Sequence, residues 1–203
     1  MRLILRTYQP TDANVLMQSI KQYKEIVESD ESFSMKGEAW YMMGLAYKQS
    51  GDSKKAFTCF KKAAAMDYSE AFAMVGDAYY EGVGVAKNPT KARQWYRKGA
   101  DMGEITAILK LADCYKRGIG CKVDYSKAME QYMHLSERTG RFWNRYADGI
   151  GIALYEIGNM YLNGLGIPAD LKKAACYFKL AMKKGCLDAE NALKGEIFKD
   201  FIR

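Results

Sequence analysis

The sequence is poor in histidine and proline, and this scarcity limits the chemistry it can perform. Among 203 residues there are one histidine, His134, and three prolines. A serine triad would need this one histidine as its base, and no Ser-x-x-Lys motif offers another nucleophile. His134 stands where other parts of the chain carry lysine or leucine at the matching position, so we expect it to face solvent. We therefore expect no enzyme and no catalytic residue.

Long apolar runs are also missing. No stretch approaches the roughly 20 residues that a membrane-spanning helix needs, so we expect no membrane association through a span. The start, MRLILRTYQP, is broken by Arg6 and Pro10 and lacks the apolar core and cleavage site of a signal peptide. These features predict a cytoplasmic protein.

Cysteine is present in an odd number and without metal-binding spacing. The closest pairs of the five cysteines are seven and ten residues apart, and no CxxC pair occurs. Zinc sites need tighter spacing and more ligands, so we expect no metal and no cofactor. In a reducing compartment Cys59, Cys114 and Cys176 are expected to be small core residues.

What the chain does have is a repeating pattern of small and aromatic residues. Three units follow the template A-x4-(G/A)-x2-Y-x2-G-x-G, then a short loop, then (D/N)-x2-K-A-x3-aromatic. They are centred on Gly76, Ala112 and Gly158, and an earlier unit around Gly44 fits with a shorter loop. Self-similarity with such a period is typical of a solenoid.

Each unit is expected to form two helices, which predicts an all-α protein. Asp52, Asn88, Asp124 and Asp170 each lie four residues before the alanine of the second half, where their side chains can cap a helix. Pro89 follows Asn88 at the first helical position, where its missing N–H costs nothing. Apolar residues then recur at steps of three and four, as on one helical face.

The Gly-x-Gly pairs resemble phosphate-binding loops but lack their context. The pairs begin at Gly82, Gly118 and Gly164, and each follows an expected helix instead of a strand. Glycine at a helix end adopts the left-handed conformation that terminates the helix. We therefore interpret these glycines as turns.

The pattern resembles the Sel-like repeat family, a branch of the tetratricopeptide superfamily. The resemblance is carried by residues 72–103, 108–132 and 155–185, while AWYMMGLAYKQSGDSKKAFTCFKKAAAM (39–66) is closer to a plain tetratricopeptide repeat. It implies an α/α solenoid, a right-handed superhelix of antiparallel helix pairs, with one tetratricopeptide-like repeat before three Sel-like repeats. It also implies binding of proteins or peptides in a concave groove, often as an adaptor or regulator, and bacterial members are numerous.

The repeats predict the organisation of the chain as a single structural domain. Residues 1–35 would form an N-terminal capping region, with an isolated helix over residues 11–29, and residues 36–203 the solenoid. The expected segments of the solenoid are repeats 36–69, 70–104, 105–150 and 151–187, then a capping helix 188–203.

The third repeat carries about ten extra residues around TGRFWNRYADG (139–149). This insertion contains Arg141, Trp143, Arg145 and Tyr146, residue types that are enriched at binding hot spots. Two interpretations remain open: an extended helix pair that packs its own aromatics, or an added binding element.

In tetratricopeptide arrays the first helix of each unit lines the groove, and the resemblance carries this role to matching positions here. Besides Leu45, the candidate partner-binding residues are Tyr41, Lys48, Asp77, Tyr80, Asp113, Lys116, Arg117, Tyr155, Asn159 and Leu162. This mixture of residue types favours a peptide or helix with both apolar and charged anchors.

The net charge of +7 leaves a second class of partner open. Paired basic residues, such as Lys61 with Lys62 and Lys172 with Lys173, fall mostly on expected second helices. A solvated outer face explains them, and contact with an acidic protein or with nucleic acid is the alternative, although no nucleic-acid motif is present. The function hypotheses are an adaptor or regulator, an immunity-type protein that neutralises a toxin, or a nucleic-acid-associated regulator. The sequence leaves the oligomeric state open.

Overall fold

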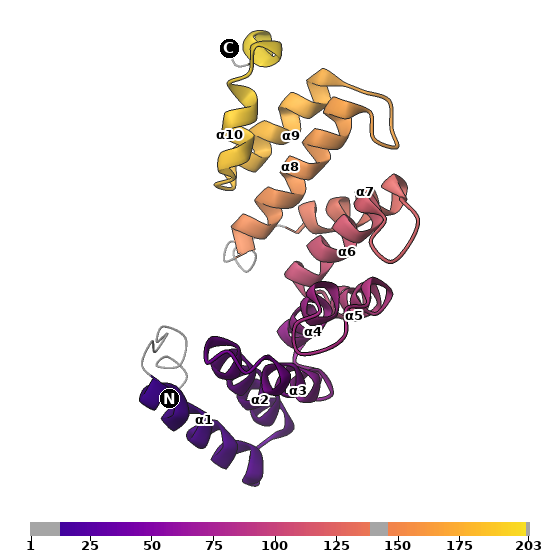
Figure 1. Cartoon of the computed structure of the whole chain (residues 1–203). Helices are drawn as coiled ribbons and strands as arrows, with labels where there is room; N and C mark the ends of the chain where they lie inside the picture. Colours follow the sequence, from indigo (N-terminus) through magenta and orange to yellow (C-terminus); the bar gives the residue numbers. More distant parts are fainter. Residues whose placement is uncertain (1–12, 139–145, 202–203) are drawn as a thin grey trace. The chain divides into compact units, whose positions relative to one another are not determined.

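The computed structural model describes residues 13–138 and 146–201 as helices joined by short loops (Figure 1). No strand occurs in these ranges. The helices are α1 (Ala13–Glu28), α2 (Phe33–Gln49), α3 (Ser53–Ala64), α4 (Ser69–Glu81), α5 (Pro89–Asp101), α6 (Ile105–Arg117), α7 (Tyr125–Ser136), α8 (Ala147–Asn163), α9 (Leu171–Lys183), α10 (Leu187–Leu193) and the 3-10 helix η2 (Glu196–Phe201). The predicted all-α class is confirmed.

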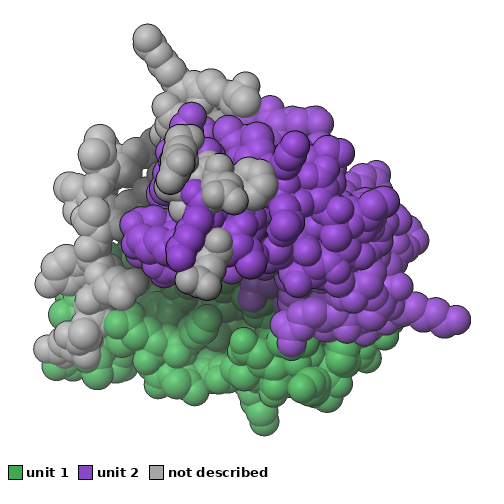
Figure 2. Space-filling model, turned by 90° about the horizontal axis from the view of Figure 1, so that it is seen from above, with its two compact units in different colours: residues 1–95 green, residues 96–203 purple. Residues whose placement is uncertain are grey.

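The chain divides into two compact units, residues 1–95 and 96–203 (Figure 2). The boundary falls inside α5. Within the first unit α2 packs on α3, and within the second α6 packs on α7 and α8 on α9. These three helix pairs fall largely within three of the four predicted repeats, whose exact bounds stay a prediction. The expectation that all of them form a single domain stays a prediction.

The pairs α2–α3 and α8–α9 cross closely at the small residue of the template. A Cβ added to Gly44 would lie 2.5 Å from the ring of Phe60, and one added to Gly158 would lie 2.6 Å from the ring of Phe178. Phe60 and Phe178 are 4% and 0% exposed, so their rings have no room to retreat. The small residue is therefore what allows a large aromatic to fill the crossing.

The second helix of every repeat begins with the predicted cap. The side chains of Asp52, Asn88, Asp124 and Asp170 each accept from the backbone N–H three residues later, at 2.9–3.1 Å. The lysine at this third position, Lys55, Lys91, Lys127 or Lys173, also lies 5.2–5.8 Å from the ring centre of the template tyrosine. The lysine of the template thus joins the two helices through a cation–π contact.

The Gly-x-Gly loops are turns, as predicted. Gly82, Gly118 and Gly164 end their helices with φ of +81°, +72° and +64°. After each loop, the backbone N–H of the capping residue donates to the carbonyl of the template tyrosine at 2.7–2.9 Å, in the pairs Asn88–Tyr79, Asp124–Tyr115 and Asp170–Tyr161. The loop is therefore tied to the helix that it leaves.

The second glycine of a loop packs against the preceding repeat. A Cβ on Gly84 would overlap the backbone carbonyl of Ser53, the first residue of α3. A Cβ on Gly166 would lie 2.5 Å from the Cβ of Tyr125, the first residue of α7. Neighbouring repeats within each unit are thus held close by a residue without a side chain.

The two ends of the chain are covered by extra helices. At the start, α1 packs on α2 and buries Leu16. At the end, the predicted capping helix 188–203 forms two separate helices, because α10 ends before Lys194–Gly195 and η2 begins after it. The break lets Phe198 turn inward, where its ring meets that of Phe178 edge-on at 5.6 Å.

The loop glycines provide a matched test of the contact between repeats. Gly84→Ala should destabilise the protein by about 1–3 kcal/mol more than Gly51→Ala, because overlap with the α3 backbone adds to the strain of a positive φ. Gly51 has φ of +84° and no atom within 4 Å of a built Cβ, so it reports strain alone. Urea denaturation measures both variants, and equal losses would contradict the close approach.

The capping aspartates should make stability sensitive to acid. The hydrogen bonds from Lys55 lower the pKa of Asp52, and those from Lys127 lower the pKa of Asp124. A lowered pKa adds stability above the unfolded value of 3.8, and this stability is lost as the pH falls through the folded value. Asp52→Asn with Asp124→Asn keeps both caps, so we expect a smaller loss of stability between about pH 5 and pH 2.

The matched control is Asn88→Asp, which places a carboxylate beside Lys91 at the equivalent cap. This variant should lose more stability on acidification than the unmodified protein. Thermal melts by circular dichroism across the same pH range measure all three proteins. Identical acid profiles for the three would show that these caps do not titrate with folding.

Candidate functional site

The predicted groove residues fall at regular positions on the first helices. Counted from the small residue of each repeat, most of these residues lie at −3, +1 and +4, a spacing that places their side chains on one face of the helix. The face carries Tyr41, Leu45 and Lys48 on α2, Asp77 and Tyr80 on α4, Asp113 and Lys116 on α6, and Tyr155, Asn159 and Leu162 on α8. Arg117 lies one residue further along α6. Within each compact unit, we call these residues the first-helix face.

In the first unit the structure brings Lys48 and Asp77 to one small pocket. The pocket lies between α2, α3 and α4, and Glu81 adds a second carboxylate to its wall. Phe57, Met74 and Val83 are among its apolar lining. Lys48 is exposed and Asp77 half-buried, so charged groups lie beside a small pocket whose lining is largely apolar.

The tyrosines of the first-helix face are less free to bind than the charged residues. The rings of Tyr41 and Phe60 lie 5.7 Å apart, and Tyr155 and Phe178 repeat this contact at 5.5 Å. Both tyrosines are half-buried and pack on the crossing of their own repeat. Tyr80 differs, since its half-buried ring is approached by the Lys87 ammonium at 5.8 Å. Tyr80 is therefore the best aromatic candidate of this face.

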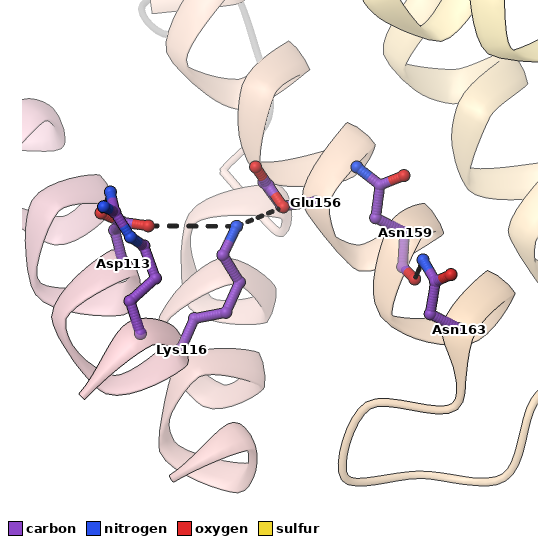
Figure 3. Close-up of polar contacts among 6 residues, drawn as sticks. Asp113, Lys116, Glu156, Asn159 and Asn163 are labelled. Carbon is purple, nitrogen blue, oxygen red and sulfur yellow. Dashed lines mark hydrogen bonds and ion pairs between the residues drawn. The ribbon is translucent and has the colours of Figure 1, made fainter. Parts of the chain in front are cut away.

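In the second unit the face is a network of charges across α6 and α8 (Figure 3). The Lys116 Nζ lies 2.8 Å from Glu156 Oε2 and 4.0 Å from Asp113 Oδ1. Asp113 also accepts from Arg117 Nη1 at 3.0 Å. The Lys116 and Glu156 side chains are only 21% and 22% exposed, so this pair is the best shielded part of the site.

A tyrosine beneath the network feels its charge. Burial raises the pKa of Tyr132, and the nearby carboxylates of Glu156 and Asp113 raise it further. Tyr132 is 2% exposed and remains a neutral hydroxyl. The charge network therefore lies close to a buried, uncharged phenol.

Amides extend the polar strip along α8. Asn163 Nδ2 donates to the backbone carbonyl of Asn159 at 2.9 Å (Figure 3). Asn159 is half-buried and Asn163 exposed, and Leu162 beside them is half-buried. The face of α8 therefore offers amide groups next to an apolar side chain.

Of the predicted insertion residues, only Tyr146 can be placed. Arg141, Trp143 and Arg145 lie outside the described residues. Tyr146 precedes α8 and is 37% exposed. The two interpretations of the insertion stay open.

The cysteine prediction was partly wrong. Cys59 and Cys114 are buried as expected, and burial raises the pKa of the Cys59 thiol to about 11, so it is a poor nucleophile. Cys176, however, is exposed. It lies two residues after Ala174 on α9, whereas Cys59 lies three after Ala56, and this one-residue difference turns Cys176 to the outer side of its helix.

Other chemistry finds little support in the described ranges. His134 is exposed, as predicted. No group of three or more histidine, cysteine, aspartate or glutamate side chains there could hold a metal ion. Among the described helices, none is both long enough and apolar enough to span a bilayer.

Glu156 is a residue of this candidate site that the sequence did not indicate. It lies on α8 two residues before Gly158, and its partner is 40 residues away on α6. Nothing local marks this pair, because it depends on how α6 and α8 come together. The sequence offers one indication of this pair: Glu156 is a carboxylate next to the predicted positions of the first-helix face.

The shielded pair can be tested by a double-mutant cycle with Lys116→Met and Glu156→Gln. We expect a coupling free energy of about 1 kcal/mol, since both side chains are largely buried. The control cycle uses Arg117→Met and Asp113→Asn, whose pair is more exposed and should give about 0.3 kcal/mol. Chemical denaturation measures both cycles, and no coupling in the first would show that this pair does not organise the face.

Comparison with protein families matches four consecutive segments to repeats. The Sel1 repeat model matches residues 69–104, 105–130 and 151–186. A tetratricopeptide repeat model matches residues 37–70. No curated protein matches the sequence.

A solved structure with a TM-score above 0.5 has the same fold. A Sel1 repeat protein from Oxalobacter formigenes is 26% identical, with a TM-score of 0.71 over 89% of this chain and 71% of that one. Two others have a TM-score of 0.47: c5321, a protective antigen of uropathogenic Escherichia coli with an SLR fold, and a putative sel1 repeat protein from Klebsiella pneumoniae. They are 20% and 19% identical, cover 92% and 91% of this chain, and are themselves covered over 50% and 99%. With one tetratricopeptide repeat followed by three Sel1 repeats, the chain belongs to the Sel1 repeat proteins.

Proposed function

We propose that this protein is an interaction module that binds a protein or peptide on its first-helix face. Sel1 and tetratricopeptide repeats are generally protein–protein interaction modules, which supports a binding role. Within that role we favour an adaptor or regulator without catalytic activity, acting in the cytoplasm of a bacterium.

One observation carries the proposal: the template residues are used for packing, and the first-helix face is left with chemically varied side chains. Alanines, aromatics and cap residues of the template are spent on helix crossings and loops. The remaining face offers Lys48, Asp77 and Tyr80 in the first unit and Asp113 and Asn159 in the second. Varied, half-exposed groups on rigid helices suit the recognition of one particular surface.

The charges of the face suggest what it binds. In the first unit one lysine and two carboxylates surround an apolar pocket, and in the second the cations and carboxylates balance. Such a surface is poorly suited to the uniform negative charge of nucleic acid. It suits a peptide or helix that carries an apolar anchor together with charges of both signs.

Two narrower roles differ in their partner. An immunity-type protein would bind one toxin and block it, and an adaptor would join its partner to a larger assembly. A nucleic-acid-associated regulator would instead use the basic pairs of the second helices. The experiment below separates the protein-binding roles from the last one.

The test is affinity capture from native lysate, with and without nuclease, followed by mass spectrometry. We expect a dominant protein that survives nuclease and whose recovery falls at least about tenfold with Tyr80→Ala and Asn159→Ala combined. The matched control, Gln94→Ala with Lys172→Ala on exposed positions of α5 and α9, should leave recovery unchanged. Recovery that vanishes with nuclease, or that ignores the first-helix variant, would reject the proposal.

A further inference from the structure

We propose a second docking surface in the first unit, a groove between α1 and the α2–α3 pair that binds an acidic amphipathic helix of another protein. We call it the α1 groove. Both surfaces involve α2, but the α1 groove uses other residues than the first-helix face, so either proposal can fail without the other.

The α1 groove consists of two adjoining hollows of about 640 and 490 Å³. They share Tyr47 and Lys55, so they form one continuous depression along α1. Each has the volume of a typical ligand pocket. The depression is therefore long enough to take more than one side chain of a partner.

The floor of the groove is apolar. Leu16, Met17 and Ile20 of α1 line one hollow, and Val27, Trp40 and Met43 line the other. Met17 is 71% exposed, so its apolar side chain is open to contact with a partner. Apolar residues on both walls match the apolar stripe of an amphipathic helix.

The rim of the groove is cationic. Lys24, Lys55 and Lys62 line it, against the carboxylates of Glu28 and Asp52. Both carboxylates already lie near a lysine, with Lys24–Glu28 at 3.7 Å and Lys55–Asp52 at 2.8 Å. The rim therefore has three lysines against two carboxylates. The rest of α3 adds positive charge, because its sequence SKKAFTCFKKAA contains four lysines and no acidic residue.

Two of these lysines are placed to hold a helix. Lys55 and Lys62 are seven residues apart on α3, two helical turns or roughly 10 Å along its axis. Lys62 Nζ lies 4.0 Å from the ring centre of Trp40, which fixes this ammonium beside the apolar floor. A partner helix with carboxylates at a similar spacing would meet both cations while its apolar stripe enters the hollows.

Charge favours a partner protein over the chain's own segments. Residues 1–12 contain Arg2 and Arg6 against one carboxylate, Asp12, and the whole chain has a net charge of +7. A lysine rim repels both the basic N-terminal segment and a second copy. Nucleic acid would satisfy the lysines but leave the apolar floor empty.

The proposal is tested by selecting binders from a displayed library of 20-residue helix-forming peptides with randomised faces. The enriched peptides should be amphipathic and net negative. Fluorescence anisotropy should show affinity weakened tenfold or more by Lys62→Glu and by Met17→Glu. Both side chains are exposed, and thermal melts confirm that the variants fold.

The matched controls are Lys54→Glu on α3 and Met35→Glu on α2, which are exposed in the same unit but do not line the groove. They should change affinity less than threefold. A peptide with lysine in place of its glutamates should regain affinity for Lys62→Glu. Failure to enrich any peptide, enrichment of neutral or basic peptides, or equal effects of groove and control variants would each overturn the proposal.

Discussion

The architecture depends on how closely two helices can approach at a residue without a bulky side chain. Gly44 and Gly158 leave space for the rings of Phe60 and Phe178 that an added Cβ would overlap, and Gly84 does the same for the backbone at the start of α3. Close packing of this kind leaves little freedom for substitution, because an interior at crystal-like density cannot absorb extra atoms cheaply. The small residues of the repeat therefore determine its packing as much as the aromatic residues do.

This constraint divides the surface into residues with structural and binding roles. The template alanines, aromatics and caps are committed to crossings, and each template lysine is committed to a tyrosine ring. The charged residues of the first-helix face, and Met17, Lys24 and Lys62 of the α1 groove, have no such role in the template. A chain built in this way can change its partners while keeping its fold, which is why repeat membership alone does not identify a partner.

Much of the fold could be predicted because it is written in local chemistry and then repeated. Asp124 was expected to cap a helix and Gly118 to end one, and each requires knowledge of only a few neighbouring residues. The pairing of Lys116 with Glu156 was not predicted, since it joins side chains of different repeats. Cys176 was wrongly predicted to be buried, because a shift of one residue decides which side of α9 it faces. The capping helix was predicted too long, because the end of α10 before Gly195 was not recognised.

The candidate site was harder to predict than the fold. Sequence spacing identified the helical face, but the burial of each side chain depends on its neighbours in space. Tyr41 and Tyr155 pack on aromatic rings, whereas Tyr80 meets a loop lysine. Position in the repeat therefore indicated which residues lie on the face, and the structure separates the packing residues from the binding candidates.

The most direct test of the binding face is photo-crosslinking in the cells that produce the protein. A photoreactive amino acid would replace Tyr80 or Asn159 on first helices, and Gln94 or Lys172 on second helices. The account predicts a covalent adduct with one protein from the first-helix positions and none from the second-helix positions. Adducts formed only from Gln94 or Lys172, or adducts with nucleic acid, would contradict it.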